Sequence, residues 1–375
     1  MPSKGADVVV IGGGVVGLSL AWRLAQAGTS VAVIDAGCDD GQASVASAGM
    51  LAPLAESEKE GPLVHLGLDS LRRYPGFVSE LREESGVALG LSGPGTLRVA
   101  EDQAEEEALA SAFARQKTAG LPLDWLDAQA VQSLEPALTD RVRAAVLSPE
   151  EKHIEPGALL AALAAACHRR NVRLEPGRAV GFEVQGRCVA SVETSAGSWS
   201  GARAVIAAGA WSASLARRLG VELPLFPVRG QLLALRCPYP LLRHTIYSHA
   251  GYLVPRTEGR LIVGATVERV GFDPSTTDAG QAVLLTSARR LAPPLGTIPV
   301  ESRWAGLRPG SGDGLPVLGP LPGWENVCIA TGHFRNGILL APVTADMMSR
   351  FILGGAIEPA LEPFLADRWA ETPAS

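Results

Sequence analysis

A glycine-rich turn near the start of the chain constrains the fold more than any other feature. Residues 12–17 read GGGVVG, which matches the pattern G-x-G-x-x-G. The β-branched run at 7–11 precedes this turn and predicts a buried parallel strand, while 15–27 has a helical pattern that Gly28 ends. A second apolar run follows at 31–34. The segment therefore predicts a βαβ unit of about thirty residues.

The turn has the chemistry of a dinucleotide site. Gly12 permits a tight turn, Gly14 lets the backbone approach a pyrophosphate, and Gly17 allows close packing of helix on strand. The helix N-terminus supplies partial positive charge for the phosphates. Asp35 lies eighteen residues after Gly17, where its carboxylate can accept hydrogen bonds from ribose hydroxyls. The motif does not separate NAD from FAD, and a glycine-rich turn in another α/β protein stays the alternative.

Composition excludes several classes of protein. The 375 residues are 47% hydrophobic and 19% charged, which indicates a well-buried protein of two domains. A net charge of −6 argues against a surface for nucleic acid or for a membrane. Five cysteines without C-x-x-C spacing and six histidines without a ligand pattern predict no disulfide framework and no metal, and favour the reducing cytoplasm. We find no apolar stretch near the roughly 18 residues of a membrane helix.

The β-rich middle of the chain lies between dinucleotide-type elements at both ends. Buried strands are expected at 203–208 and 326–330, a terminal helix at 336–353, and several strands within 228–273. We predict an α/β fold, in which a Rossmann-like domain is assembled from discontinuous segments and a second domain has a large, mostly antiparallel sheet. The predicted first domain comprises 1–85, 145–222 and 300–375, and the second comprises 86–144 and 223–299.

Three segments favour a flavin as the dinucleotide. Residues 203–211 (RAVIAAGAW) predict a strand running into a small-residue turn, as found near the adenosine end of FAD in two-domain flavoproteins. Residues 43–50 (ASVASAGM) are small and polar enough to wrap a phosphate and a ribityl chain, although an ordinary loop has the same composition. Residues 331–342 (TGHFRNGILLAP) begin the terminal helix, whose N–H groups could face the flavin N1–C2=O region.

These segments make the chain resemble the D-amino-acid oxidase family of flavoproteins, and within it the bacterial glycine oxidases of thiamine biosynthesis. The resemblance covers nearly the whole chain and is densest at VVVIGGGVVGLSLAWRLA, ASVASAGMLAP, GYLVPR, RWAGLRPGSGDGLPVLG and GHFRNGILLAP. It implies that the Rossmann-like domain binds FAD and that the second domain binds substrate. The implied reaction is oxidative deamination of glycine to the imine and glyoxylate, with oxygen reduced to hydrogen peroxide.

The same resemblance suggests the partners of the chain. A small amino acid and oxygen are the implied reactants, with no nucleic acid and no stable membrane association. Hand-over of the imine to a thiazole synthase and assembly into a homo-oligomer both stay open.

Three substrate-side residues follow from the resemblance. Arg308 would hold the substrate carboxylate, for which a guanidinium offers two charge-assisted hydrogen bonds. The Tyr252 hydroxyl would be a second carboxylate contact, and Arg335 would lie at the pocket mouth. A surface ion pair is the alternative for Arg308, and a core hydroxyl bonded to a carbonyl is the alternative for Tyr252.

The resemblance also implies a set of residues that contact FAD. We expect FAD to be bound non-covalently, because no Cys or His lies in an attachment motif. The implied contacts are Gly12, Gly14, Val15, Val16, Gly17, Asp35, Ala36, Ala43, Ser44, Ala48, Gly49, Met50, Val180, His333, Phe334, Arg335, Asn336, Gly337, Ile338 and Leu339.

One position departs from the family pattern. Val267 follows Gly264-Ala265-Thr266, where relatives have a methionine. The smaller side chain could enlarge the pocket, which leaves sarcosine and small D-amino acids open as substrates. Three other functions stay open as well: a dehydrogenase of the same fold that reduces a quinone or a partner subunit, a flavin-binding subunit of a larger complex, and an NAD-dependent dehydrogenase.

Overall fold

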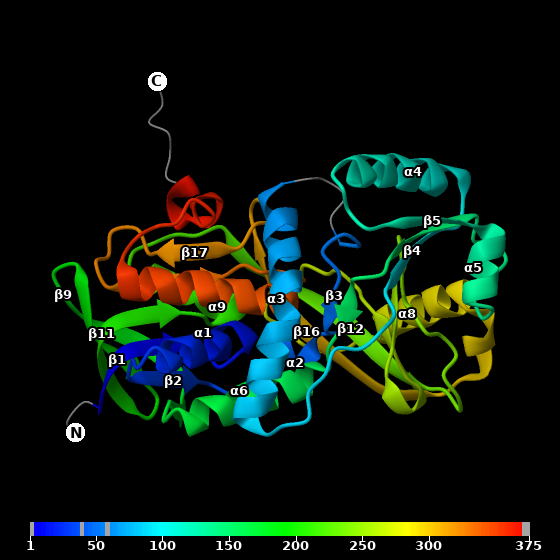
Figure 1. Cartoon of the computed structure of the whole chain (residues 1–375). Coiled ribbons are helices and arrows are strands. Elements are labelled where there is room, and N and C mark those ends of the chain that lie inside the picture. The colour runs from blue at the N-terminus through cyan, green and yellow to red at the C-terminus, as the bar shows by residue number, and fades with distance from the viewer. Residues whose placement is uncertain (1–3, 38–40, 57–60, 370–375) are drawn as a thin grey trace.

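Two large sheets make up the centre of the molecule. The computed structural model describes residues 4–37, 41–56 and 61–369. In Figure 1 the first sheet lies on one side with α1, α6 and α9, and the second lies on the other side with α4, α5 and α8. The prediction of an α/β fold with a Rossmann-like part and a second large sheet is confirmed.

The first sheet grows from the βαβ unit at the N-terminus. In spatial order its strands are β17 (Val317–Pro320), β18 (Val327–Thr331), β11 (Gly197–Ile206), β1 (Lys4–Ile11), β2 (Val31–Asp35) and β8 (Arg173–Pro176), and β10 (Cys188–Thr194) with β9 (Ala179–Gln185) extends from β11. The pairs β1–β2, β1–β11 and β11–β18 are parallel. Their carboxyl ends therefore meet at one edge, where ligands bind in such sheets.

Four helices pack together beside the first sheet. They are α1 (Val15–Gln26), α3 (Pro62–Ser85), α6 (Pro156–Arg169) and α9 (Gly337–Gly354). The rings of Trp22 and Phe77 lie 5.4 Å apart edge-on, and the Tyr74 hydroxyl donates to the Ile338 carbonyl. These contacts fix α1, α3 and the start of α9 in one core.

The helix α9 differs from our expectation about apolar stretches. Its 18 residues are long and apolar enough to cross a membrane by length and composition. However, 72% of this stretch is buried inside the protein, where it packs on α1 and α3. Burial of most of its residues explains an apolar composition without a membrane, so α9 is a core helix.

The second sheet is antiparallel except at one pair. Its strands in spatial order are β16 (Val300–Ser311), β12 (Leu225–Arg236), β15 (Arg260–Gly264), β14 (Gly251–Pro255), β13 (Thr245–Ser248), β4 (Thr96–Ala100), β6 (Ala144–Ser148) and β5 (Asp124–Asp127). Only β13 and β4 pair in parallel among these described strands. The helices α4 (Gln103–Thr118), α5 (Ala128–Leu134) and α8 (Asp278–Leu291) cover it.

Four short elements connect these parts: α2 (Ala43–Ala46), β3 (Met50–Leu51), β7 (Lys152–His153) and α7 (Ser212–Arg218). Two strands fall on the other side of the predicted domain boundaries. Both β6 and β16 belong to the second sheet, although boundaries at 145 and 300 assign nearly all of them to the first domain. An apolar strand does not reveal its pairing partner, and β16 pairs with β12 along most of its length. We therefore propose that these two boundaries lie at the ends of β6 and β16.

Candidate active site

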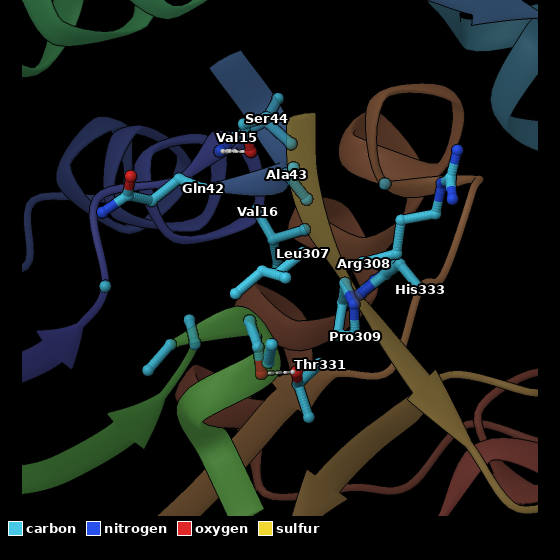
Figure 2. A pocket seen from close by; sticks show the side chains of 18 of the residues that line it. Val15, Val16, Gln42, Ala43, Ser44, Leu307, Arg308, Pro309, Thr331 and His333 are labelled. Carbon is cyan, nitrogen blue, oxygen red and sulfur yellow. Dashed lines mark hydrogen bonds between the residues drawn. The ribbon is translucent and has the colours of Figure 1, made fainter. Parts of the chain in front are cut away.

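A cavity of about 360 Å³ lies where the carboxyl edge of the first sheet meets the second sheet. Gly12, Asp35, Ala207 and Thr331 line it at or just beyond the ends of four strands of the first sheet. Leu232, Tyr252 and Arg308 line it from the second sheet. Figure 2 shows Val15 and Ser44 on one side of this cavity, with Arg308 and His333 on the other. A ligand here would contact both sheets at once.

The glycine turn forms a cradle that side chains would fill. Gly12 has φ +115°, and a Cβ there would lie 2.4 Å from the Ala207 carbonyl oxygen. A Cβ on Gly17 would lie 1.9 Å from the Gly12 carbonyl oxygen. The Val15 N–H donates to the Ser44 hydroxyl at 3.1 Å, which holds α2 against the start of α1 (Figure 2). The turn therefore leaves backbone N–H groups and open space where phosphates bind such a helix.

Asp35 lies at the nucleotide end of the cavity. Its carboxylate accepts from the Gly13 N–H at 2.5 Å and from the Gly37 N–H at 2.8 Å. These two bonds orient the carboxylate beside the glycine turn, where it also lines the cavity. This is the place at which a ribose would meet an acid in a dinucleotide-binding βαβ unit.

The loop before α9 closes another side of the cavity. Gly332 has φ +76° and Phe334 has φ +49°, so the chain turns sharply between β18 and the helix. The His333 Nε2 lies 3.1 Å from the Thr344 hydroxyl, and burial lowers the pKa of this imidazole to about 4. His333 is therefore neutral near pH 7. Gly337 and Ile338 in the first turn of α9 also line the cavity, and the N–H groups of a first helical turn have no partner within the helix.

Arg308 and Tyr252 form the polar end of the cavity on the second sheet. The Arg308 Nη1 donates to the Thr266 carbonyl at 3.0 Å. Loss of water lowers the pKa of Arg308, and the neighbouring Tyr252 opposes this change. Burial raises the pKa of Tyr252 to about 12, so its hydroxyl stays protonated. Together they offer a cation and a neutral donor to an anionic group.

Two glycines make room for these side chains. On β12, Gly230 lies diagonally across from Arg308 of β16, and a Cβ on it would lie 2.1 Å from the Arg308 Nη2. Gly264 is directly opposite Tyr252, and a Cβ there would lie 2.4 Å from the Tyr252 hydroxyl. Both glycines are in extended strands, so the missing side chain and not an unusual backbone angle is what matters.

Arg335 lies next to the same end of the cavity. Its Nη1 donates to the Tyr247 hydroxyl at 3.4 Å, and its guanidinium carbon lies 5.5 Å from the centre of the Phe334 ring. Arg335 lines the cavity together with Arg308 and Tyr252. The structure thus brings the three residues expected at the substrate side into one place.

Most residues expected to contact FAD also line this cavity. They are Gly12, Gly14, Val15, Val16, Asp35, Ala36, Ala43, Ser44, Ala48, Gly49, Met50, His333, Phe334, Arg335, Gly337 and Ile338. Four others lie outside the lining: Gly17 packs on the strand side of the turn, Asn336 is the N-cap residue of α9, Leu339 is buried in the helical core, and Val180 is exposed.

Val180 and Val267 lie away from the cavity. Val180 is exposed on β9, whereas the preceding residues 177–179 line the wall. Within β9, strand alternation explains why Val180 differs from Ala179, because neighbouring side chains on a strand point to opposite faces. Val267 is also exposed and lies outside the lining, so a valine here does not enlarge this cavity.

Sequence reasoning missed several wall residues. Glu56, Gly230 and residues 177–179 all line the cavity. No motif distinguishes Glu56 or Gly230 in the sequence, because their positions depend on contacts with distant segments. Within the described ranges, no group of three or more His, Cys, Asp or Glu is arranged to hold a metal ion.

Comparison with known proteins agrees with this geometry. The family model described as "DAO: FAD dependent oxidoreductase" matches residues 7–351, and the chain belongs to this family of FAD-dependent oxidoreductases. A glycine oxidase of Bacillus licheniformis is 34% identical over 97% of this chain and 98% of that protein. The crystal structure of glycine oxidase from Geobacillus kaustophilus superposes with a TM-score of 0.93, at 32% identity over 98% of this chain and 99% of that one.

A third relative is a bifunctional protein ThiO/ThiG of Synechocystis sp., which is 37% identical over 98% of this chain. This chain spans 54% of that longer protein. The cofactor of the family is FAD, and the glycine cradle with Asp35 fits it. The alternative of an NAD-dependent dehydrogenase has no support from these relatives.

We expect Gly230→Ala to misplace Arg308 without unfolding the protein. The added methyl meets the far end of a flexible side chain, which can move away at low cost to folding. A displacement of about 1 Å in a substrate-positioning group lowers catalysis about a hundredfold. Steady-state kinetics should therefore show a large loss in kcat/KM, with normal flavin absorbance. Unchanged kcat/KM would show that the guanidinium does not need this position.

Proposed function

We propose that this chain catalyses the FAD-dependent oxidation of glycine to its imine and glyoxylate, with oxygen reduced to hydrogen peroxide. The observation that carries the proposal is that Arg308 and Tyr252 both line one end of a cavity whose other end is the dinucleotide cradle. Glycine oxidases that match nearly the whole chain support it.

The substrate carboxylate would lie against Arg308. The guanidinium can donate two parallel hydrogen bonds to it, and the protonated Tyr252 hydroxyl can donate a third. Anchoring the carboxylate fixes the position of the α-carbon. When bound, FAD would supply the two-electron acceptor for the hydride on that carbon and the route for those electrons to oxygen. A substrate that binds as ammonium must lose a proton before the hydride leaves, because the amine has to be neutral in that step.

The substrate range beyond glycine is part of this proposal. Leu232 and Met50 line the cavity and pack in one apolar cluster with Tyr252. Sarcosine and small D-amino acids such as D-alanine add only one methyl group to glycine. We propose that they are turned over with lower kcat/KM, since a methyl group changes discrimination by about 1–3 kcal/mol in an apolar pocket.

A partner and a location follow from the same relatives. The ThiO/ThiG relative combines two functions in one chain, which supports hand-over of a reaction product to a second protein. We propose that the imine passes to a thiazole synthase and that the protein works in the cytoplasm. Non-covalent attachment of FAD belongs to the same proposal.

A substrate panel tests the proposed function. Purified protein is incubated with glycine, sarcosine, D-alanine and L-alanine, and hydrogen peroxide is measured with a coupled peroxidase. We expect the highest kcat/KM with glycine and negligible turnover of L-alanine. Peroxide formation from D-alanine or sarcosine alone would replace glycine as the substrate and leave the flavin chemistry intact.

A further inference from the structure

Glu56 places a carboxylate at the substrate end of the cavity. It lines the wall together with Arg308, Arg335 and Tyr252. Burial raises the pKa of this carboxyl to about 7, while the charges of Arg335 and Arg308 lower it. The groups thus influence one another electrostatically across the same enclosed space. The family contacts considered above assign no role to this acid.

Arg308 and Arg335 both donate hydrogen bonds to groups other than Glu56. Arg308 donates to the Thr266 carbonyl, and Arg335 donates to the Tyr247 hydroxyl. Among the residues that the structure describes, no side chain forms an ion pair with Glu56, although both arginines act on its pKa. The Glu56 carboxylate and the two guanidinium groups therefore line the same cavity and carry opposite charges.

A network of buried side chains holds the backbone that leads to Glu56. The Glu151 Oε1 accepts from the Leu54 N–H at 2.8 Å and from the Ala55 N–H at 3.3 Å. Arg98 Nη1 donates to the Leu54 carbonyl at 3.1 Å. Glu151 and Arg98 are both buried and belong to the second sheet or its connecting turn. Glu56 thus enters the cavity from a fixed backbone.

We propose that Glu56 binds the ammonium group of the amino-acid substrate while Arg308 binds its carboxylate. This inference rests on the proposed function and specifies the class of substrate as a small zwitterion. In an amino acid the two charges are one carbon apart, so one molecule can satisfy both sides of the cavity. A bound ammonium also favours the ionised form of Glu56, because an opposite charge nearby stabilises it.

The same arrangement should discriminate against carboxylates that lack an amine. Acetate would bring its negative charge to Arg308 without offering a cation to Glu56. Two carboxylates would then share one enclosed cavity, where like charges repel more strongly than in water. Glu56 is therefore a specificity-determining residue that favours glycine and disfavours acetate.

The test compares Glu56→Gln with the wild-type holoenzyme at mildly alkaline pH, where the carboxyl is ionised. Binding of acetate is measured from the change in the flavin spectrum, and kcat/KM is measured for glycine. We expect kcat/KM for glycine to fall about tenfold or more, which is typical of losing a hydrogen bond to a charged group. Acetate should bind more tightly, because the repelling charge is gone.

Two further variants serve as controls for this result. Glu150→Gln removes an exposed carboxylate beside Glu151 and makes the same change in net charge, and it should alter neither quantity. Glu56→Asp keeps the charge on a shorter side chain, and it should recover part of the glycine activity and weak acetate binding. If Glu56→Gln weakens both ligands together, or leaves acetate binding unchanged, the inference is wrong. Absence of glycine turnover in the wild type would instead contradict the proposed function, and acetate binding would still report on Glu56.

Discussion

Replacing Arg308 by alanine is expected to lower kcat/KM for glycine by two to three orders of magnitude or somewhat more while FAD stays bound. Arg308 is the cation at the substrate end of the cavity, with Tyr252 beside it. Losing one partner of a buried ion pair costs roughly 3–5 kcal/mol, which corresponds to that loss in rate. Steady-state kinetics together with the flavin spectrum measure both parts of the result.

Two controls separate anchoring of the carboxylate from a general disturbance. Arg308→Lys should recover only part of the activity, because an ammonium lacks the planar pair of donors. Amines without a carboxylate should be poor substrates of the wild type and lose little more in Arg308→Ala. If Arg308→Ala kept a near-normal kcat/KM for glycine, the substrate carboxylate would have to bind to Arg335 or Tyr252 instead.

Gly12→Ala is expected to abolish stable FAD binding. The residue has φ +115°, and its Cβ would lie 2.4 Å from the Ala207 carbonyl oxygen. The strained backbone costs about 1–3 kcal/mol, and overpacking adds a similar amount. Because β1 and β11 would have to separate there, we expect flavin content to fall at least about tenfold, which needs only 1.4 kcal/mol. Acid precipitation, which releases non-covalent FAD, measures the flavin-to-protein ratio.

Gly157→Ala is the matched control. Gly157 lies in the first turn of α6, and a Cβ there would meet nothing within 4 Å. Such a change usually stabilises a protein by about 0.4–1 kcal/mol and should leave flavin content unchanged. Normal flavin content in Gly12→Ala would show that the cradle tolerates a side chain and that phosphates bind elsewhere.

The local motifs were the most predictable part of this molecule. The strand, glycine turn, helix and acid of residues 7–35 form one contiguous unit, so its periodicity and spacing define it without reference to the rest of the chain. The segments around Ala43, Arg308 and His333 are far apart in sequence, and only their resemblance to a family predicts that they form one site. The structure places them around one cavity.

Features that depend on long-range pairing could not be predicted. Gly230 reads as an ordinary strand glycine until β12 pairs with β16 and sets it against Arg308. The backbone before Glu56 is positioned by Glu151, which lies 97 residues after Leu54 in the chain. In each case a contact with a residue distant in sequence, and not the local sequence, determines what the residue does in the site.

Anaerobic mixing with glycine tests the central claim most directly. The account predicts that glycine bleaches the absorbance of the bound flavin, and that admitting oxygen restores it with equal amounts of glyoxylate and hydrogen peroxide. A flavin that glycine does not bleach would contradict glycine as the substrate. A bleached flavin that a quinone reoxidises quickly and oxygen reoxidises only slowly would contradict the oxidase and favour a dehydrogenase of the same fold.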